Sequence, residues 1–531
     1  MAPFGAGCRA PAKRARAVDG GSAQPVATAP IAPVPTPTIV RTDPEVVRVV
    51  IDVEPQSLNP DLDPDVWAWR IGWDAVYEPL VRPRVEADGG GFEPLLAESF
   101  RVEDDGARIT MKLRTGVTFH DGSKLTASDV AFTFDRVRSG KTRAPRVQAL
   151  LSELERVEIA GPQTVRFVWH RPSAYSLVAI SEVGILPESV FGKGDLNYAS
   201  GNRHPVGTGP LKVDSWERGK RILLSRYPGY WGEPARAEKM VVEIQGDAVK
   251  AIGRAKHGEV DLLGRVPPAW IPEQLESPSL KALFKPVRVE RTRFSFVLWN
   301  VTHAPLDNVE VRRALGSALD KKRLLAEARH GLGRPLAAVP ASAELAVPAG
   351  DPIGAQAAID RLLPRGPAGR LRGGRRFQLL VPTGSREAEA AGKRVEAALV
   401  KLGLSVELLT GDLGILMLRI KKGMFDAALL EWAGGDDEDL GPLFKSHAQH
   451  NYGNFSSHEV DRLIEALRQP PGNEGERAER PGLRKRLAEQ LAREAPALFL
   501  YAPDDMYLYA RRLRQPRRAG DFVLLRDVGP E

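Results

Sequence analysis

The segment from Leu96 to Val137 constrains the fold more than any other part of the chain, because it sets two tight turns and a helix start in a fixed order. Phe100 to Val102 and the alternating stretch Arg108 to Leu113 are typical of two strands joined by an Asp-Asp-Gly turn. An Asp-Gly turn comes next, and then residues 126–129, where a Thr or Ser can cap a helix. The segment therefore predicts a strand-turn-strand-turn-helix unit.

A second region, between residues 378 and 430, alternates apolar strands with amphipathic helices. We expect strands at 378–381, 405–409 and 427–430, and helices at 386–402 and 413–422. Strands that alternate with helices predict an α/β fold with a mainly parallel sheet.

Composition and charge limit the class of protein. With 531 residues, 43% of them apolar, the chain can bury more than one core, which predicts two to four domains. No run of 18 apolar residues occurs, so we expect no membrane-spanning helix. The 75 basic and 68 acidic residues leave a net charge of +7, which is weak support for nucleic-acid binding, and we expect no nucleic-acid partner.

The single cysteine, Cys8, excludes an intrachain disulfide framework. The sequence Gly-Ala-Gly-Cys at residues 5–8 resembles the end of a bacterial lipobox, which implies a lipid anchor on Cys8 and a membrane partner. Gly5 stands where an aliphatic residue is usual, and only residues 1–4 precede it, so an incidental cysteine stays the alternative. A mis-called start codon would explain both departures. Residues 9–44 are rich in Pro and Ala and predict a disordered tether.

Residues that carry catalysis or bind cofactors are sparse. The chain contains no GxSxG, HExxH or CxxC motif, and the turn at 207–209 lacks the Lys-Ser/Thr of a phosphate loop. His120 lies in a turn, where an exposed or capping role is expected rather than a catalytic one. His447, His450 and His458 could suit a divalent ion, although histidines in a loop-rich region are usually solvated. We expect no catalytic residue, no cofactor and no metal.

The 96–137 unit resembles the signature of family 5 of the extracytoplasmic solute-binding proteins, the dipeptide, oligopeptide and nickel-binding components of ABC importers. Three further segments carry the same resemblance in the same order. They are Gly207–Leu211 with Trp216, Tyr230 and Trp231, then Asn300, Asp307 and Val311–Leu315 with Asp320, and finally Phe425-Asp426, Trp432, Asn451-Tyr452 and Glu459–Asp461.

This resemblance implies a periplasmic-binding-protein type II fold: two lobes joined by a hinge, with an extra domain of the cluster C type. The implied domains are a tether at 1–45, lobe I from 46–84, 205–295 and 505–531, extra domain II at 85–204, and lobe II at 296–504.

It also implies the function: a non-enzymatic substrate-binding protein that captures peptides or related amino-containing solutes in an interlobe cleft. Domain closure would present the bound solute to a membrane permease and its ATPase. A monomer in the periplasm or at the cell surface is expected. The alternatives are a sensor of the same fold, and a protein that binds nickel, another metal chelate or a sugar.

The family's ammonium-binding aspartate follows a conserved tryptophan strand. A gapless match of this chain after Trp432 puts Gly435 in that position, and one inserted glycine would restore the aspartate as Asp436. Both readings stay open. A buried ammonium needs a carboxylate, and a buried carboxylate needs an arginine or backbone donors.

Further ligand contacts are expected beside the strand at 294–298 and among the N-terminal aromatic residues. Asn300 could hydrogen-bond a ligand or fix the hinge, and aromatic residues at helical spacing are more often core than ligand contacts. The predicted ligand-binding set is Trp432, Asp436, Asn300, Trp299, Arg291, Trp69 and Tyr77.

Overall fold

A computed structural model describes most of the chain beyond the first 44 residues. The described residues are 45–62, 66–73, 75–84, 91–103, 106–290, 293–363, 376–433, 439–470, 474–514, 518–519, 522–523 and 525–530. The predictions for the tether, Cys8, Arg291 and Asp436 lie outside these residues.

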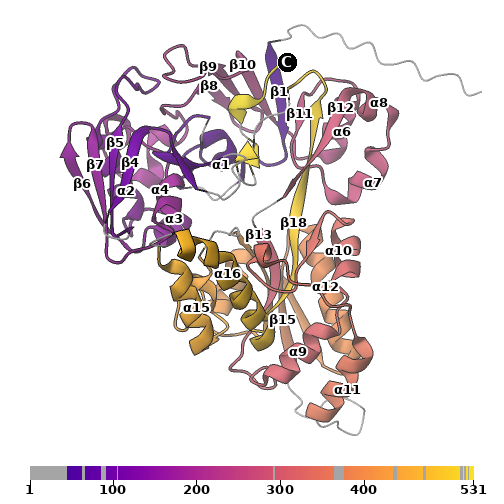
Figure 1. Ribbon diagram of the computed structural model, residues 1–531. Helices are drawn as coiled ribbons and strands as arrows, with labels where there is room; N and C mark the ends of the chain where they lie inside the picture. Colours follow the sequence, from indigo (N-terminus) through magenta and orange to yellow (C-terminus); the bar gives the residue numbers. More distant parts are fainter. Residues whose placement is uncertain are drawn as a thin grey trace, which may run out of the picture. The chain divides into compact units, whose positions relative to one another are not determined.

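The described residues form a mixed α/β architecture (Figure 1). The strands are β1 (Val46–Ile51), β2 (Val81–Pro83), β3 (Phe92–Pro94), β4 (Ala97–Glu103), β5 (Arg108–Leu113), β6 (Leu154–Gly161), β7 (Thr164–Trp169), β8 (Leu211–Glu217), β9 (Arg221–Arg226), β10 (Lys239–Ile244), β11 (Leu262–Leu263), β12 (Phe284–Glu290), β13 (Arg293–Trp299), β14 (Gly333–Pro335), β15 (Phe377–Pro382), β16 (Val406–Gly411), β17 (Ala427–Ala433), β18 (Ala497–Ala510), β19 (Arg518–Ala519) and β20 (Phe522–Val523). The helices are α1 (Val66–Gly72), α2 (Ala127–Arg138), α3 (Pro145–Leu150), α4 (Ser176–Ser181), α5 (Glu188–Phe191), α6 (Ala248–Lys256), α7 (Ile271–Gln274), α8 (Pro278–Leu283), α9 (Val309–Ser317), α10 (Lys321–Arg329), α11 (Pro352–Leu362), α12 (Arg386–Lys401), α13 (Leu413–Lys421), α14 (Gly441–Phe444), α15 (His458–Arg468) and α16 (Glu474–Glu494).

The strand-turn-strand-turn-helix prediction is confirmed as β4, β5 and α2. The backbone N–H and the hydroxyl of Thr126 both donate to the Asp129 carboxylate, at 2.9 and 2.7 Å, and so fix the start of α2. β4 and β5 belong to a four-stranded antiparallel sheet of order β4-β5-β7-β6. α2 packs on this sheet, with the rings of Phe134 and Phe167 in edge-to-face contact at 4.8 Å.

The second sheet has twelve strands in the order β16-β15-β17-β13-β18-β11-β1-β10-β9-β8, with β12 and β14 also paired to β18. The predicted strands and helices between 378 and 430 are confirmed as β15, α12, β16, α13 and β17. The predicted parallel pairing is confirmed for β15 with β16 and β17, whereas β13, which lies outside the predicted region, is antiparallel to both β17 and β18. β13 and β18 come from segments distant in sequence, so no crossover helix dictates their direction.

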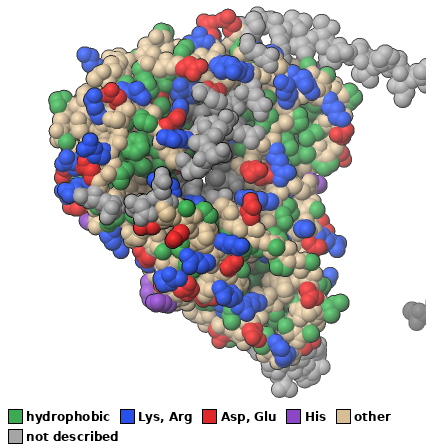
Figure 2. All heavy atoms as spheres, in the orientation of Figure 1, with side chains coloured by type: hydrophobic (Ala, Val, Ile, Leu, Met, Phe, Trp, Pro, Cys, Tyr) green, Lys and Arg blue, Asp and Glu red, His purple; other side chains and the backbone are tan. Residues whose placement is uncertain are grey.

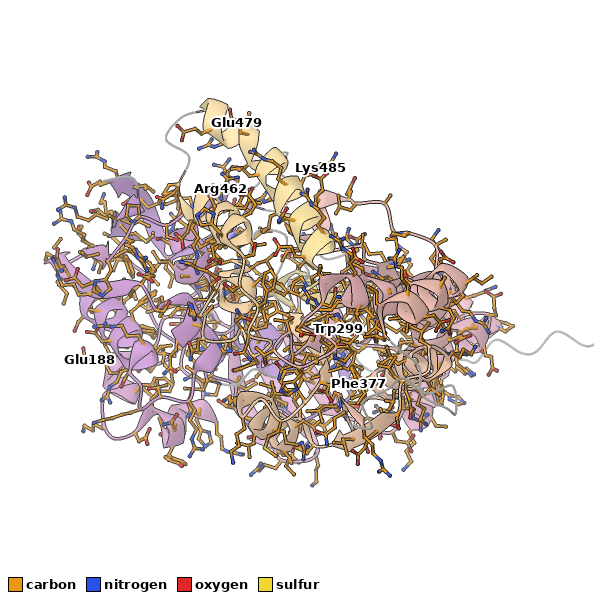
Figure 3. The ribbon with its side chains drawn as sticks, turned by 90° about the horizontal axis from the view of Figure 1, so that it is seen from below. Glu188, Trp299, Phe377, Arg462, Glu479 and Lys485 are labelled. Carbon is orange, nitrogen blue, oxygen red and sulfur yellow. The ribbon has the colours of Figure 1, made fainter. Side chains whose placement is uncertain are left out.

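The C-terminal part of this sheet is covered on both faces. Successive side chains of β13 point to opposite faces. Phe296 and Leu298 pack with α13–α16, whereas Val297 and Trp299 pack with α9–α12. In Figure 3 Trp299 lies in the interior, while Glu479 and Lys485 lie on α16 at the periphery.

The described residues contain no helix that combines the length and the apolar composition needed to cross a bilayer. Figure 2 shows Lys and Arg side chains intermixed with Asp and Glu over the face in view.

Residues 96–137, called the signature unit below, contact the turn at 207–209 through His120. The Gly207 N–H donates to His120 Nδ1 at 3.3 Å, so Nε2 carries the proton and donates to the Gly209 carbonyl at 2.9 Å. The expectation of an exposed or capping histidine is therefore half right: His120 satisfies backbone groups, but it is partly buried rather than exposed. Burial lowers its pKa to about 4.

Candidate functional site

The segment before α4 contacts the end of α15, and we call this contact the seam. The Ala174 N–H donates to the Arg468 carbonyl at the end of α15, at 2.7 Å. A Cβ added at Gly106, which lies in the turn between β4 and β5, would be 3.0 Å from Pro470. Residues separated by about 300 positions in sequence therefore meet here.

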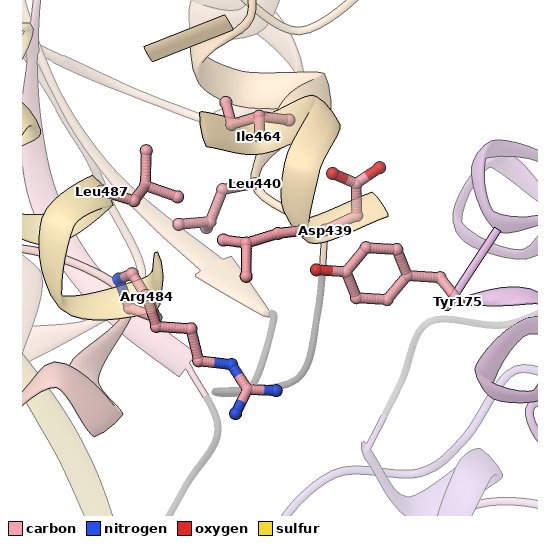
Figure 4. A pocket seen from close by; sticks show the side chains of 8 residues that line it. Tyr175, Asp439, Leu440, Ile464, Arg484 and Leu487 are labelled. Atoms are coloured by element: carbon pink, nitrogen blue, oxygen red, sulfur yellow. The ribbon is translucent and has the colours of Figure 1, made fainter. Parts of the chain in front are cut away.

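A small pocket, continuous with solvent and with room for about one water molecule, opens in this seam (Figure 4). Its lining residues are Tyr175, Pro340, Asp439, Leu440, Ile464, Leu467, Arg484 and Leu487. Tyr175 approaches from the side opposite to Leu487, and the aliphatic side chains come from the segment before α14 and from α15 and α16. The pocket thus combines an aliphatic wall with a phenol, a carboxylate and a guanidinium.

Asp439 is held rigidly at the rim. Arg468 Nε donates to its Oδ2 at 2.8 Å, and the Gly441 N–H donates to its Oδ1 at 2.8 Å. Arg468 also lies 3.4 Å from Glu465, which pairs with Lys445. A carboxylate fixed in this way is preorganised to accept a further charge-assisted hydrogen bond.

An aromatic group lies on the same C-terminal region, at the end of β17. The ring of Trp432 is 5.7 Å from that of His450, and His450 Nδ1 lies 3.1 Å from the Tyr452 hydroxyl. Burial, with a smaller contribution from the Lys421 charge, lowers the pKa of His450, and burial raises the pKa of Tyr452. Trp432 Nε1 is buried and has no hydrogen-bond partner among the described residues, and the role of Trp432 as a ligand contact stays a prediction.

Asn300 and Trp299 sit within the packed interior. The Asn300 amide accepts from the Thr302 hydroxyl at 2.7 Å and donates to the carbonyls of Gly423 and Phe425, both at 3.3 Å. These bonds tie the end of β13 to the start of β17. Trp299 is fully buried, and its role as a ligand contact stays a prediction, as does that of Asn300.

Trp69 and Tyr77 are also buried, in the N-terminal region. Trp69 stacks on Trp73 with ring centroids 4.5 Å apart. The Tyr77 hydroxyl donates to the Gly201 carbonyl at 3.4 Å, and burial, assisted by the Asp61 charge, raises its pKa. The aromatic residues at this spacing lie in the core, as expected of the pattern, and their contact with a ligand stays a prediction.

The structure does not bring the predicted set together. Of its five members that lie in the described ranges, none lines the seam pocket. Asp439, which belongs to the acidic stretch after Trp432, does line the pocket. Tyr175 and Arg484 were not predicted, and no local motif marks them.

No group of three or more His, Cys, Asp or Glu side chains in the described ranges is arranged to hold a metal ion. His450 is engaged with Tyr452 and Trp432, and His447 has a left-handed backbone with φ of +60°.

Known proteins resemble this chain in sequence and in fold. It is 26% identical to the dipeptide-binding protein of Escherichia coli over 84% of this chain and 87% of that protein. The structure of NikA from Brucella suis in complex with Fe(III)-EDTA superposes with a TM-score of 0.78 at 21% identity, over 92% of this chain and all of that chain. The oligopeptide-binding protein AppA from Bacillus subtilis, in complex with a nonapeptide, gives a TM-score of 0.75 at 21% identity, over 92% of this chain and 99% of that chain.

These superpositions confirm the predicted fold class, that of the type II periplasmic binding proteins of family 5. Residues 91–452 match the family described as "Bacterial extracellular solute-binding proteins, family 5 Middle". Because this match spans more than half of the 531 residues, the chain belongs to the bacterial extracellular solute-binding proteins of family 5.

Proposed function

We propose that this protein is the extracytoplasmic binding component of an ABC importer and that its solutes are short peptides. The observation that carries the proposal is the match of residues 91–452 to the family 5 solute-binding proteins. We propose the seam pocket as one point of contact with the peptide. Its aliphatic wall lies between a fixed carboxylate, Asp439, and a guanidinium, Arg484. A peptide zwitterion that leaves water needs a carboxylate for its ammonium and a cation for its own carboxylate, and its side chains need apolar surface.

The relatives support the same class of solute. The Escherichia coli relative is a dipeptide-binding protein, and the AppA structure contains a nonapeptide. The partners in this proposal are a membrane permease with its ATPase. A lipid anchor on Cys8 and a monomeric binding protein complete it.

The test is binding by the full-length protein to a panel of di-, tri- and longer peptides, followed as thermal stabilisation. A peptide at one hundred times its Kd should add about 2.7 kcal/mol to the free energy of unfolding. Mass spectrometry of solute carried through purification identifies the natural ligand. Stabilisation by a nickel or iron chelate, and by no peptide, would contradict the proposal.

Tyr175→Phe tests whether the seam pocket is the site. Removing the hydroxyl that borders the pocket should weaken peptide binding about threefold to tenfold, the range expected for one lost hydrogen bond. Tyr198→Phe is the matched control, because Tyr198 is 71% exposed and does not line the pocket. If both variants bound peptide with the affinity of the unaltered protein, the seam pocket would not be part of the binding site.

A further inference from the structure

The long strand β18 changes its partners at one point. Its first residues pair with β13, and Tyr501–Pro503 pair with β14, both from the C-terminal region. From Asp504 onward it pairs with β12, and at Leu508–Tyr509 also with β11. Two consecutive acidic residues, Asp504 and Asp505, therefore stand where the strand passes from one set of partners to the other.

The side chains of consecutive strand residues point to opposite faces. On one face, the Asp504 carboxylate pairs with Arg288 of β12. The same guanidinium donates to the Gly333 carbonyl in β14 at 2.9 Å, and Arg329 of α10 donates to the Asp504 carbonyl at 2.7 Å. This face ties the crossing point to β14 and α10.

On the other face, the Asp505 carboxylate lies 3.7 Å from Arg70 of α1 and 4.0 Å from Arg265. The Arg70 side chain is only 2% exposed, and its guanidinium stacks between the rings of Trp67 and Tyr507, 5.0 and 4.8 Å from their centroids. This geometry ties the crossing point to the N-terminal region.

The network continues to Asp52, the residue directly after β1. Arg265 lies 3.6 Å from Asp52, whose carboxylate accepts from Trp67 Nε1 at 2.6 Å. Arg265 also has φ of +52°, a backbone conformation that a bulky L residue rarely adopts, so its surroundings hold it in place. Buried ion pairs are expensive to break from one side, because the remaining charge stays desolvated.

We propose that Asp504 and Asp505 form a two-sided clamp. It fixes the angle between the two regions joined by β18, one containing β13 and β14 and the other containing β11 and β12. Asp505 is the positioning residue that sets how readily these regions separate. The conformation described here includes the Ala174–Arg468 bond across the seam, so the clamp belongs to an arrangement in which the seam is closed. Weakening it shifts the population toward separation and lowers the affinity for any solute that needs closure.

The first experiment does not depend on the identity of the solute. Cys8 is the only cysteine, so a Cys8→Ser background accepts two spin labels, at Ile159→Cys in β6 and Ile353→Cys in α11, which are 56% and 82% exposed. Asp505→Asn should lengthen or broaden the distance distribution of the ligand-free protein. Arg70→Met should do the same, and the double variant should not exceed Asp505→Asn, because Asp505→Asn already removes the pair with Arg70.

The matched control is Asp135→Asn, which breaks an exposed pair with Arg138 in α2 and should leave the distances unchanged. Unaltered distances in both Asp505→Asn and Arg70→Met would overturn the clamp. Equal changes in the control would also overturn it.

The second experiment rests on the proposed function. With a bound peptide, Asp505→Asn should raise Kd about tenfold, mainly through faster dissociation. The melting temperature should fall as well, because the buried Arg70 charge loses its partner carboxylate. A lower melting temperature with unchanged Kd and unchanged distances would show a merely structural role. If the unaltered protein binds no peptide, the proposed solute class fails, and the label distances still decide the clamp.

Discussion

The contact between the signature unit and the 207–209 turn differs from the seam pocket in the room that each leaves beside its polar groups. At the first, His120 is bonded on both ring nitrogens to the 207–209 turn, and a side chain at Gly207 has no room. At the second, Asp439 and Arg484 border space that is open to solvent. The contact between His120 and the 207–209 turn therefore leaves no room beside it, whereas the seam pocket keeps space beside Asp439 and Arg484.

Gly207→Ala should produce the largest effect. The new Cβ would lie 1.9 Å from the Val76 carbonyl oxygen, so the backbone must move, at a cost above about 4 kcal/mol. The matched control is Gly253→Ala in α6, where nothing lies within 4 Å and a gain of about 0.5–1 kcal/mol is expected. Urea unfolding measures both. If Gly207→Ala left the free energy of unfolding unchanged, the contrast between the crowded 207–209 turn and the open seam pocket would be contradicted.

The pH dependence of stability should come next in size. The pKa of His120 falls from an ordinary value near 6.5 to about 4, chiefly through burial. Between pH 6.5 and 4, the His120 side chain binds a proton in the unfolded chain but stays neutral in the folded protein. The free energy of unfolding should therefore fall by about 3 kcal/mol as the pH drops from 6.5 to 4.

The control for this prediction compares two variants by denaturation at several pH values. His120→Asn should lose that part of the slope, whereas His458→Asn, at an exposed position, should keep it. A slope unchanged in His120→Asn would show that His120 titrates normally.

Glu78→Gln should cost less, about 2 kcal/mol. Glu78 is fully buried and accepts from the Tyr230 hydroxyl at 2.6 Å and from Trp231 Nε1 at 3.0 Å, with Arg526 at 3.7 Å. The amide oxygen can still accept from Trp231 Nε1 while the amide nitrogen donates to the Tyr230 hydroxyl, but the negative charge beside a buried guanidinium is lost. Calorimetry should show a lower melting temperature, and peptide affinity should not change. An altered affinity would indicate that the surroundings of Glu78 belong to the binding site.

Trp432→Phe should have the smallest effect on stability and the clearest on binding. Its Nε1 bonds to no described residue, so the free energy of unfolding should change by less than about 1 kcal/mol. If the indole donates to the solute, Kd should rise about fivefold, as titration calorimetry can measure.

Trp299→Phe gives the opposite pattern, because Trp299 is fully buried. It should lose about 1–3 kcal/mol of stability through the cavity and keep its Kd. A lower affinity in this variant would support the prediction that Trp299 contacts the ligand.

Much of the fold could be predicted because its signals are local. The cap before α2 needs only Thr126 and Asp129, three residues apart, and the strands and helices from β15 to β17 follow from their own periodicity. The direction of β13 and β18 could not be predicted, because strand pairing depends on partners far along the chain.

The candidate site was harder to predict for the same reason. Tyr175 and Arg484 line one pocket, although more than 300 residues separate them and neither belongs to a motif. The predicted aromatic residues Trp69 and Trp299 turned out buried, because helical or strand spacing shows which side chains share a face but not what covers that face.

The sequence by itself determined the family and the local elements, since turns, caps and hydrophobic periodicity are written within a few neighbouring residues. Only the tertiary structure decided that His120 is partly buried, that Asp439 borders a pocket, and that Asp504 and Asp505 face opposite sides of a crossing strand. Burial and ion pairing depend on groups brought together from distant positions, and these fix the desolvation and the charge that each side chain experiences.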